Sequence, residues 1–312
     1  MSNSNDSFKI DIRSGHIPVL LNETVKLLSP ADGETYLDCT FGGGGHTRAI
    51  LRSAACKVIA VDRDAEAAKR AEEVKAEFGG RFEFRSMKFS EIDKLGLSGV
   101  AGVLFDFGVS SFQLDDGKRG FSINRPAKID MRMDNTEGES ALEFIARADE
   151  HELGRVLRDY GEERSFKKIA RAIIAARDEG KIITTADLAE VVAAVSHAHG
   201  HIHPATKTFQ ALRIKVNDEL GEIKTALPKA FDALKSGGVL AAISFHSLED
   251  RIVKQYFKRQ AGRPESRSDT SFLQDRVRRA ALLTNKPVTA APEEIALNPR
   301  SRSAKLRALK KD

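Results

Sequence analysis

Short apolar segments alternate with amphipathic segments along the first part of the chain. Residues 46–54 and 65–79 have the composition of helices, and the second of these ends at a glycine. Four segments have the apolar or alternating pattern of strands: residues 33–41, 56–64, 81–92 and 100–111. Strands and helices that alternate at this spacing form right-handed βαβ units. The pattern therefore predicts an α/β fold with a parallel sheet.

This alternation stops after the fourth strand, and the next convincing strand is at residues 237–245. The interval between them has a helical pattern, and residues 165–180 show the i, i+3, i+4 apolar spacing of an amphipathic helix. Such an interval is too long for a loop, so we expect an inserted helical domain. The expected division is a discontinuous domain at residues 1–114 and 217–312, with the insertion at residues 115–216.

After the insertion the pattern of helices and strands returns. Residues 217–238 are typical of a crossover helix that is interrupted at Pro228 and followed by a Gly-Gly turn. Residues 247–260 form a further predicted helix, which begins with the capping-box-like pair Ser247 and Asp250. Two closing edge strands are expected at residues 285–291 and 303–311.

Composition limits the class of protein. The chain has 312 residues, of which 41% are hydrophobic, so it can bury a substantial core. It contains neither an apolar run long enough to span a bilayer nor an N-terminal signal pattern. Its two cysteines, Cys39 and Cys56, exclude a disulfide framework. These features predict a soluble cytoplasmic protein.

The charge is distributed unevenly along the chain. Residues 251–312 contain 16 Lys or Arg and 6 Asp or Glu, so this segment carries +10 of a total net charge of +5. A basic segment on a mildly acidic body suits a polyanionic partner such as nucleic acid. A solvated segment that promotes solubility would have the same composition, and charge alone leaves both interpretations open.

Four consecutive glycines follow the first predicted strand, in the sequence DCTFGGGGHT at residues 38–47. Each glycine in ordered backbone costs about 0.5–1 kcal/mol relative to alanine. Ligands of parallel sheets bind at the carboxyl ends of strands, so we expect a ligand to approach the bare backbone here. A nicotinamide dinucleotide fits poorly, because its fingerprint needs a third glycine where this chain has Thr47.

S-adenosylmethionine fits this turn better than a dinucleotide does. Its carboxylate suits the amino end of the helix that follows, and Asp38 is placed to pair with its ammonium group. Asp62, at the end of the second strand, can accept hydrogen bonds from the ribose hydroxyls, with Asp64 as the second candidate. Local roles remain as alternatives, since Asp38 could cap the helix and Asp62 could be a surface acid.

Other reactive side chains have simpler interpretations. Cys39 lies inside the strand that precedes the glycines, where a small buried residue is more typical than a nucleophile. Histidines at positions 197, 199, 201 and 203 have a spacing compatible with a metal, but no acid or cysteine accompanies them and we predict no metal site. Lys207 and Arg213 are available for phosphates. His246 and Ser247 follow the fifth strand and are expected to border the target pocket, although Ser247 could equally cap the next helix.

Nine sequence blocks closely resemble the bacterial ribosomal RNA small-subunit methyltransferase H family. In chain order they are HIPVLLNETVKLL, DCTFGGGGHT, VDRD, FDFGVSSFQLDDGKRGFS, DMRMD, YGEER, HPATKTFQALRIKVNDEL, ISFHSLEDRIVK and NPRSRSAKLR. The resemblance implies a class I (Rossmann-like) S-adenosylmethionine-dependent methyltransferase fold with an inserted helical domain. It also implies methyl transfer to N4 of a cytidine in the decoding centre of 16S rRNA, within the small ribosomal subunit. A homodimer remains open as the oligomeric state.

The resemblance also carries the site residues over to this chain. Phe89 would lie beside the adenine, although a plain core aromatic is the alternative. Gln113, in the loop after the fourth strand, would meet the cofactor or the target base. The full set of implied cofactor contacts is Gly44, Gly45, His46, Asp62, Phe89, Asp106 and Gln113.

Asp106 is the expected catalytic residue. An exocyclic cytosine amine is a weak nucleophile, so an acceptor for its protons and an in-line approach to the methyl group are required. Two rival functions remain: a DNA amino-methyltransferase, whose Pro-Pro motif is absent after Asp106, and a non-catalytic ribosome assembly factor.

Overall fold

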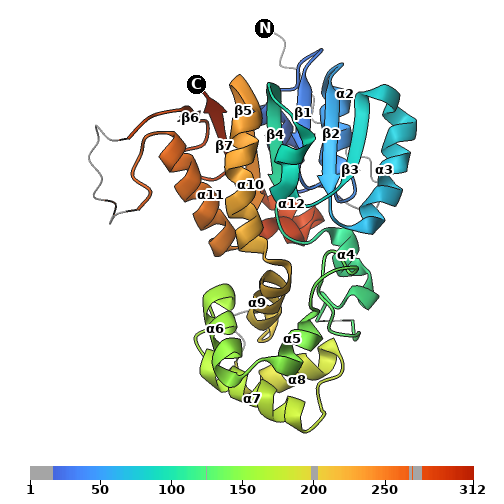
Figure 1. Ribbon diagram of the computed structural model, residues 1–312, viewed down its shortest axis with the longest axis vertical. Coiled ribbons are helices and arrows are strands. Elements are labelled where there is room, and N and C mark those ends of the chain that lie inside the picture. Colours follow the sequence, from blue (N-terminus) through green and yellow to red (C-terminus); the bar gives the residue numbers. More distant parts are fainter. Residues whose placement is uncertain (1–16, 124, 198–202, 267–268, 270–275) are drawn as a thin grey trace. The chain divides into compact units, whose positions relative to one another are not determined.

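A computed structural model of the chain describes residues 17–123, 125–197, 203–266, 269 and 276–312 (Figure 1). The chain divides into two compact units. The first joins the part up to Gly108 with Leu220–Asp312, and the second is Val109–Glu219. The boundaries expected from the pattern lay a few residues away, at 114/115 and 216/217.

The first unit contains a seven-stranded sheet with the order β3-β2-β1-β4-β5-β7-β6 (Figure 1). The strands are β1 (Thr35–Asp38), β2 (Lys57–Asp62), β3 (Phe82–Ser86), β4 (Val100–Asp106), β5 (Leu234–Ser244), β6 (Ala280–Leu282) and β7 (Lys305–Lys311). The first five are parallel, whereas β7 is antiparallel to β5 and to β6. This order and the helical insertion confirm the predicted class I, Rossmann-like methyltransferase fold. The strand order reverses beside β1, where such sheets bind ligands.

Helices cover both faces of the sheet because successive strand residues point to opposite faces. Tyr36 and Leu104 belong to one buried cluster, and the adjacent Leu37 and Phe105 belong to the other. The helices of this unit are α1 (Leu21–Leu28), α2 (Gly45–Ser53), α3 (Ala65–Phe78), α10 (Glu219–Ala233), α11 (Ser247–Gln260) and α12 (Pro292–Leu297). α2 and α3 pack in the first cluster through residues such as Ile50 and Val74, and α10 packs in the second. Within the described residues, every helix is too short or too polar to traverse a lipid bilayer.

Three local expectations were wrong. α10 continues through Pro228, because buried residues on both sides of the proline, such as Leu227 and Phe231, anchor it. The predicted Gly-Gly turn lies inside β5, where the pairing with β4 shifts register between Val100 and Gly102. Residues 285–291 form only an isolated bridge from Val288 to β7, and β6 takes the edge position instead.

The second unit is helical. Its helices are α4 (Ser111–Asp115), α5 (Ala141–Arg147), α6 (Glu150–Gly161), α7 (Phe166–Asp178), α8 (Thr185–Val195) and α9 (Thr206–Asn217). Their apolar faces form one cluster, and Val109 and Leu114 pack against it, which explains why this unit begins earlier than the pattern indicated. The Asn217 amide donates to the Met131 carbonyl and accepts from the Met133 N–H, so the DMRMD segment is held inside the unit.

Candidate active site

The glycine turn after β1 needs glycine for its own packing. Gly42 and Gly44 have φ of +52° and +73°, and α2 begins at Gly45 without a side-chain cap. A Cβ at Gly44 would lie 2.7 Å from the Phe41 ring, and a Cβ at Gly45 would lie 2.2 Å from Cγ of Pro18. At these two positions the group that approaches the bare backbone is therefore a neighbouring side chain of the protein itself. The uncapped N–H groups of α2 remain suited to an anionic ligand group.

Because of the close approach of Pro18, a Gly45→Ala substitution should lower the stability of the protein, although helix propensity alone predicts that it raises it. Propensity alone predicts a gain of about 1 kcal/mol, whereas displacement of Pro18 should cost about 1–3 kcal/mol and weaken cofactor binding. We expect a net loss of stability in chemical denaturation, together with weaker S-adenosylhomocysteine binding in calorimetry. Gly154→Ala is the matched control, because its Cβ would meet nothing closer than 3.5 Å and the substitution should stabilise α6. A Gly45→Ala protein more stable than the parent would contradict this account.

Asp38 and Asp62 hold the turn through hydrogen bonds. Asp38 is 1% exposed and accepts from the Thr47 hydroxyl at 2.7 Å and from the Thr40 N–H at 3.1 Å. Asp62 accepts from the Gly42 N–H at 2.8 Å through one carboxylate oxygen and from the N–H of residue 64 at 2.9 Å through the other. Burial raises the pKa of Asp62 and raises that of Asp38 to about 6. A buried acid, Asp38, and a half-buried acid, Asp62, thus lie close to the turn, where a cationic group would stabilise both.

Asp64, the second candidate for the ribose, has a local role. Its side chain caps α3 by accepting from the Glu66 N–H at 3.1 Å, and it is buried. This leaves Asp62 as the acid at the end of β2 that faces the glycine turn.

Asp106 ends β4 beside these acids. Its N–H donates to the Thr40 hydroxyl at 2.6 Å, and one carboxylate oxygen, Oδ2, lies 3.7 Å from Nδ1 of His46. The other oxygen, Oδ1, is buried and has no hydrogen-bond partner among the described residues. Burial, together with the charges of Asp38 and Glu249, raises the pKa of Asp106 well above its usual value.

His46 is a neutral imidazole in this site. It is 6% exposed, and burial lowers its pKa to about 4. Nε2 lies 3.1 Å from the Val19 carbonyl oxygen, which can only accept, so Nε2 carries the proton. Nδ1 therefore presents its lone pair towards Asp106.

Phe89 begins a short 3₁₀ helix, η3 (Phe89–Leu95), after β3. Its ring packs against Phe105 and Phe107, with centroid distances of 5.7 and 5.9 Å. The two partners are buried and Phe89 is partly exposed. The core role is thus observed, and a contact with adenine stays a prediction that the exposed part of the ring permits.

Gln113 lies in the helical unit, in α4 rather than in a loop. It is 5% exposed and forms a capping box with Ser110, in which its side chain accepts from the Ser110 N–H at 2.9 Å. Its predicted contact with the cofactor or the target base stays a prediction.

One other sequence interpretation changes, that of Arg213. Arg213 is committed to a bidentate ion pair with Glu219, at 2.7 and 2.9 Å, so the expectation that it is available for phosphates was wrong. Lys207 is partly exposed, and its ammonium group donates to the Glu162 carbonyl oxygen at 3.2 Å. Nδ1 of His203 accepts from the Ala205 N–H, and residues 199 and 201 of the histidine series lie outside the described residues.

Cys39 is 1% exposed, and burial raises the pKa of its thiol. It is therefore the small buried residue that the pattern favoured over a nucleophile.

The sequence interpretation missed Glu249. The N-cap of α11 is His246 rather than Ser247, and the acid in the third helical position is therefore Glu249 rather than Asp250. The Glu249 carboxylate accepts from the N–H groups of Phe245 and His246. The sequence did contain the capping-box signal, an acid three residues after a polar residue, but two adjacent pairs have this spacing: His246 with Glu249 and Ser247 with Asp250. Which pair caps the helix depends on where β5 ends.

These residues fit S-adenosylmethionine. The acids with raised pKa values, Asp38, Asp62 and Asp106, favour a ligand that carries positive charge, and the uncapped start of α2 favours its carboxylate. The unpartnered Oδ1 of Asp106 is a further acceptor that a ligand can satisfy.

Comparisons with known proteins show the family of this chain. Residues 13–312 match the model of the MraW methylase family. The Ribosomal RNA small subunit methyltransferase H of Rickettsia massiliae is 46% identical over 95% of this chain and 97% of its own length. The protein of the same name from Parvibaculum lavamentivorans is 46% identical over 95% of this chain and 89% of its own. Among solved structures, an rRNA methylase from Streptococcus thermophilus aligns with a TM-score of 0.42 at 11% identity, covering 95% of this chain and 98% of that one. The chain belongs to the MraW methylase family.

Proposed function

We propose that this methylase transfers a methyl group from S-adenosylmethionine to the exocyclic N4 amine of a cytidine in the decoding centre of 16S rRNA. The observation that carries the proposal is the 46% identity, over 95% of the chain, to relatives named Ribosomal RNA small subunit methyltransferase H. The partner is then the small ribosomal subunit and the location is the cytoplasm. A homodimer is a separate prediction, which light scattering of the purified protein tests.

The residues around the glycine turn would hold the cofactor. Gly44, Gly45 and His46 form the start of α2 that receives its carboxylate, and Asp38 pairs with its ammonium group. Asp62 accepts from the ribose hydroxyls and Phe89 borders the adenine. When bound, S-adenosylmethionine supplies a methyl group on a positively charged sulfur.

Asp106 would act on the target amine. The lone pair of this amine is delocalised into the cytosine ring, so the amine becomes a better nucleophile when an acceptor binds its protons. The unpartnered Oδ1 of Asp106 is such an acceptor, and the carbonyls of Phe107 and Gly108 follow it directly in the chain. Holding the amine in an attack geometry supplies much of the remaining rate enhancement.

RNA would be bound by exposed cations of the sheet unit and by the helical unit, which we propose as the substrate-recognition domain. Several cations of the basic C-terminal segment are committed to internal contacts: Arg307 pairs with Asp250, and the Lys311 ammonium group donates to three backbone carbonyls. Among the described residues, Lys254 and Lys258 of α11 make no ion pair and are free to contact phosphates. Binding through such contacts should weaken as salt rises.

Mass spectrometry of rRNA fragments tests the proposal. Small subunits from cells that lack this methylase are incubated with the protein and S-adenosylmethionine, and one cytidine of the decoding centre should gain a methyl group on N4. Transfer of tritiated methyl groups to DNA instead would support a DNA amino-methyltransferase. Cofactor binding without transfer to either substrate would support the non-catalytic assembly factor.

The raised pKa of Asp38 gives cofactor binding a defined pH dependence. Above pH about 6 the side chain is a carboxylate that can pair with the ligand ammonium group, and below that pH it is neutral. We expect the affinity for S-adenosylhomocysteine, measured by calorimetry, to fall by up to about tenfold per pH unit below pH 6.

The free energy of unfolding should depend on pH through Asp38 with the opposite sign, so that it falls as pH rises. Because the folded protein holds this proton more tightly than the unfolded chain, the contribution of Asp38 to stability is lost as pH rises from about 4 to about 6. An Asp38→Asn variant should therefore lack both pH dependences. If the parent and this variant show the same binding profile, Asp38 does not pair with the ligand.

A further inference from the structure

Buried polar atoms without a hydrogen-bond partner among the described residues gather at the carboxyl ends of two neighbouring strands. They are Oδ1 of Asp106, at the end of β4, and, just after β5, both ring nitrogens of His246 and Oε1 of Glu249. Because Nε2 of His246 and Oε1 of Glu249 lie 3.2 Å from each other, Oδ1 of Asp106 and Nδ1 of His246 are the two that most need a partner from elsewhere. The His246 side chain is only 10% exposed. Buried polar atoms are almost always satisfied in folded proteins, so two unsatisfied atoms in one region indicate a place where a ligand supplies the partner.

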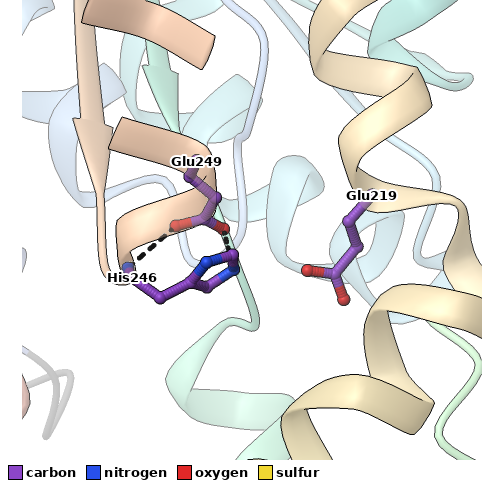
Figure 2. A group of neighbouring side chains, drawn as sticks. All are labelled: Glu219, His246 and Glu249. Atoms are coloured by element: carbon purple, nitrogen blue, oxygen red, sulfur yellow. Dashed lines mark hydrogen bonds and ion pairs between the residues drawn. The ribbon is translucent and has the colours of Figure 1, made fainter. Parts of the chain in front are cut away.

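The His246 ring is held by a fully buried carboxylate. Glu249 is 0% exposed, and one of its oxygens accepts from the N–H groups of Phe245 and His246, at 2.8 and 3.2 Å. Its other oxygen lies 3.2 Å from Nε2 of His246. Figure 2 marks this contact with a dashed line. Glu219, which is also drawn there, belongs to the helical unit, where it pairs with Arg213.

This arrangement selects one form of the neutral ring. A carboxylate next to Nε2 favours the form in which Nε2 carries the proton, and Nδ1 then offers a lone pair. The carboxylate also stabilises the ring if Nδ1 takes up a second proton, as the acid does in Ser-His-Asp triads. His246 is therefore built to accept a hydrogen bond and then a proton at Nδ1.

The pair lies close to Asp106. Asp106 is in register with Ile243, three residues before His246 in the chain. A Cβ at Gly108 would lie 4.0 Å from the Glu249 carboxylate, so this glycine brings the chain after Asp106 against the pair. The charge of Glu249 also contributes to the raised pKa of Asp106.

We propose that His246 is a second catalytic residue, whose Nδ1 binds one proton of the target amine while Asp106 binds the other, and that Glu249 is its positioning residue. This inference rests on the proposed function. The amine lone pair forms the new N–C bond as the C–S bond breaks, and the electron pair of that bond stays on sulfur. The surplus proton on nitrogen passes to Nδ1 of His246, and the imidazolium that forms is balanced by Glu249 until solvent removes the proton.

Single-turnover methylation of small subunits with His246→Asn tests the catalytic role. We expect the rate to fall about 10²–10³-fold, because a positioned general base contributes that much. The affinity for S-adenosylhomocysteine and the KM for subunits should stay within about threefold of the parent, since the variant removes an interaction of the reacting amine alone. His151→Asn, at an exposed histidine of α6, is the matched control and should transfer at the parental rate.

Nuclear magnetic resonance of ¹⁵N-histidine-labelled protein tests the positioning role without any turnover. The parent should show His246 protonated at Nε2 and unprotonated at Nδ1, and Glu249→Gln should shift this ring towards the other form. Glu249→Gln should also lower the transfer rate, because the amide keeps the shape of the carboxylate but not its charge.

The outcomes separate this inference from the proposed function. If the parent methylates the cytidine and folded His246→Asn does so within about threefold of its rate, the second catalytic residue is refuted and the function stands. A parent ring protonated at Nδ1 refutes the inference even if His246→Asn does not fold. If the parent binds the cofactor and transfers nothing to small subunits, the proposed function fails first.

Discussion

An Asp106→Ala variant should transfer methyl groups about 10²–10⁴ times more slowly than the parent, because it removes the acceptor that activates the amine. The carboxylate is unusual in that Oδ1 is buried without a partner and its pKa is well above the ordinary value. Such a group is costly in the free protein, so its removal should leave the free energy of unfolding unchanged or increase it. A slower and at least equally stable enzyme is the expected combination.

Transfer of tritiated methyl groups to small subunits and chemical denaturation measure the two effects. Asp232→Ala is a suitable control, because this aspartate of α10 is 69% exposed and should be silent in both measurements. A folded Asp106→Ala protein that methylates at the parental rate would remove Asp106 from the mechanism. A large loss of stability would show that the carboxyl group is structural.

The acids of the site were predictable because of the way parallel sheets are built. Asp38, Asp62 and Asp106 each end a strand, and the carboxyl ends of parallel strands meet at one edge. Once the strands were recognised in the sequence, the three acids could be predicted to lie close together. The same holds for α2 and α3, whose composition and glycine signals are local.

Partners that come from distant parts of the chain were not predictable. Gly45 must be glycine because of Pro18, and the ring form of His46 depends on the Val19 carbonyl, although the segment 17–20 gives no local sign of either contact. The pairing of Arg213 with Glu219 had a local spacing, but the choice between an ion pair and a free cation depends on burial. Side-chain roles of this kind follow from tertiary packing, which periodicity does not encode.

A buried ion pair fixes α11, the helix that contains Glu249, to the sheet. Arg307 of β7 donates to both carboxylate oxygens of Asp250, at 2.7 and 3.2 Å, and each residue is 8% exposed. Lys305 lies 3.7 Å from the same carboxylate. Asp250 therefore balances two cations, and Glu249 precedes it directly in the helix.

Asp250→Ala should lower the free energy of unfolding by about 3–5 kcal/mol, because it leaves the Arg307 guanidinium buried and unpaired next to Lys305. Chemical denaturation measures the loss. Lys69→Ala, which breaks an ion pair whose side chains are 73% and 51% exposed, should cost less than about 0.5 kcal/mol.

The double variant Asp250→Leu, Arg307→Met separates the cost of an unpaired charge from the value of the pair. Apolar residues of similar volume need no counter-charge, so the double variant should recover most of the stability that Asp250→Ala loses. It should also restore the position of α11, and with it the His246–Glu249 contact and the methylation rate. If the double variant is as unstable as Asp250→Ala, the ion pair itself contributes to the free energy of unfolding, beyond neutralising a buried charge. The position of α11 on the sheet would then depend on this ion pair.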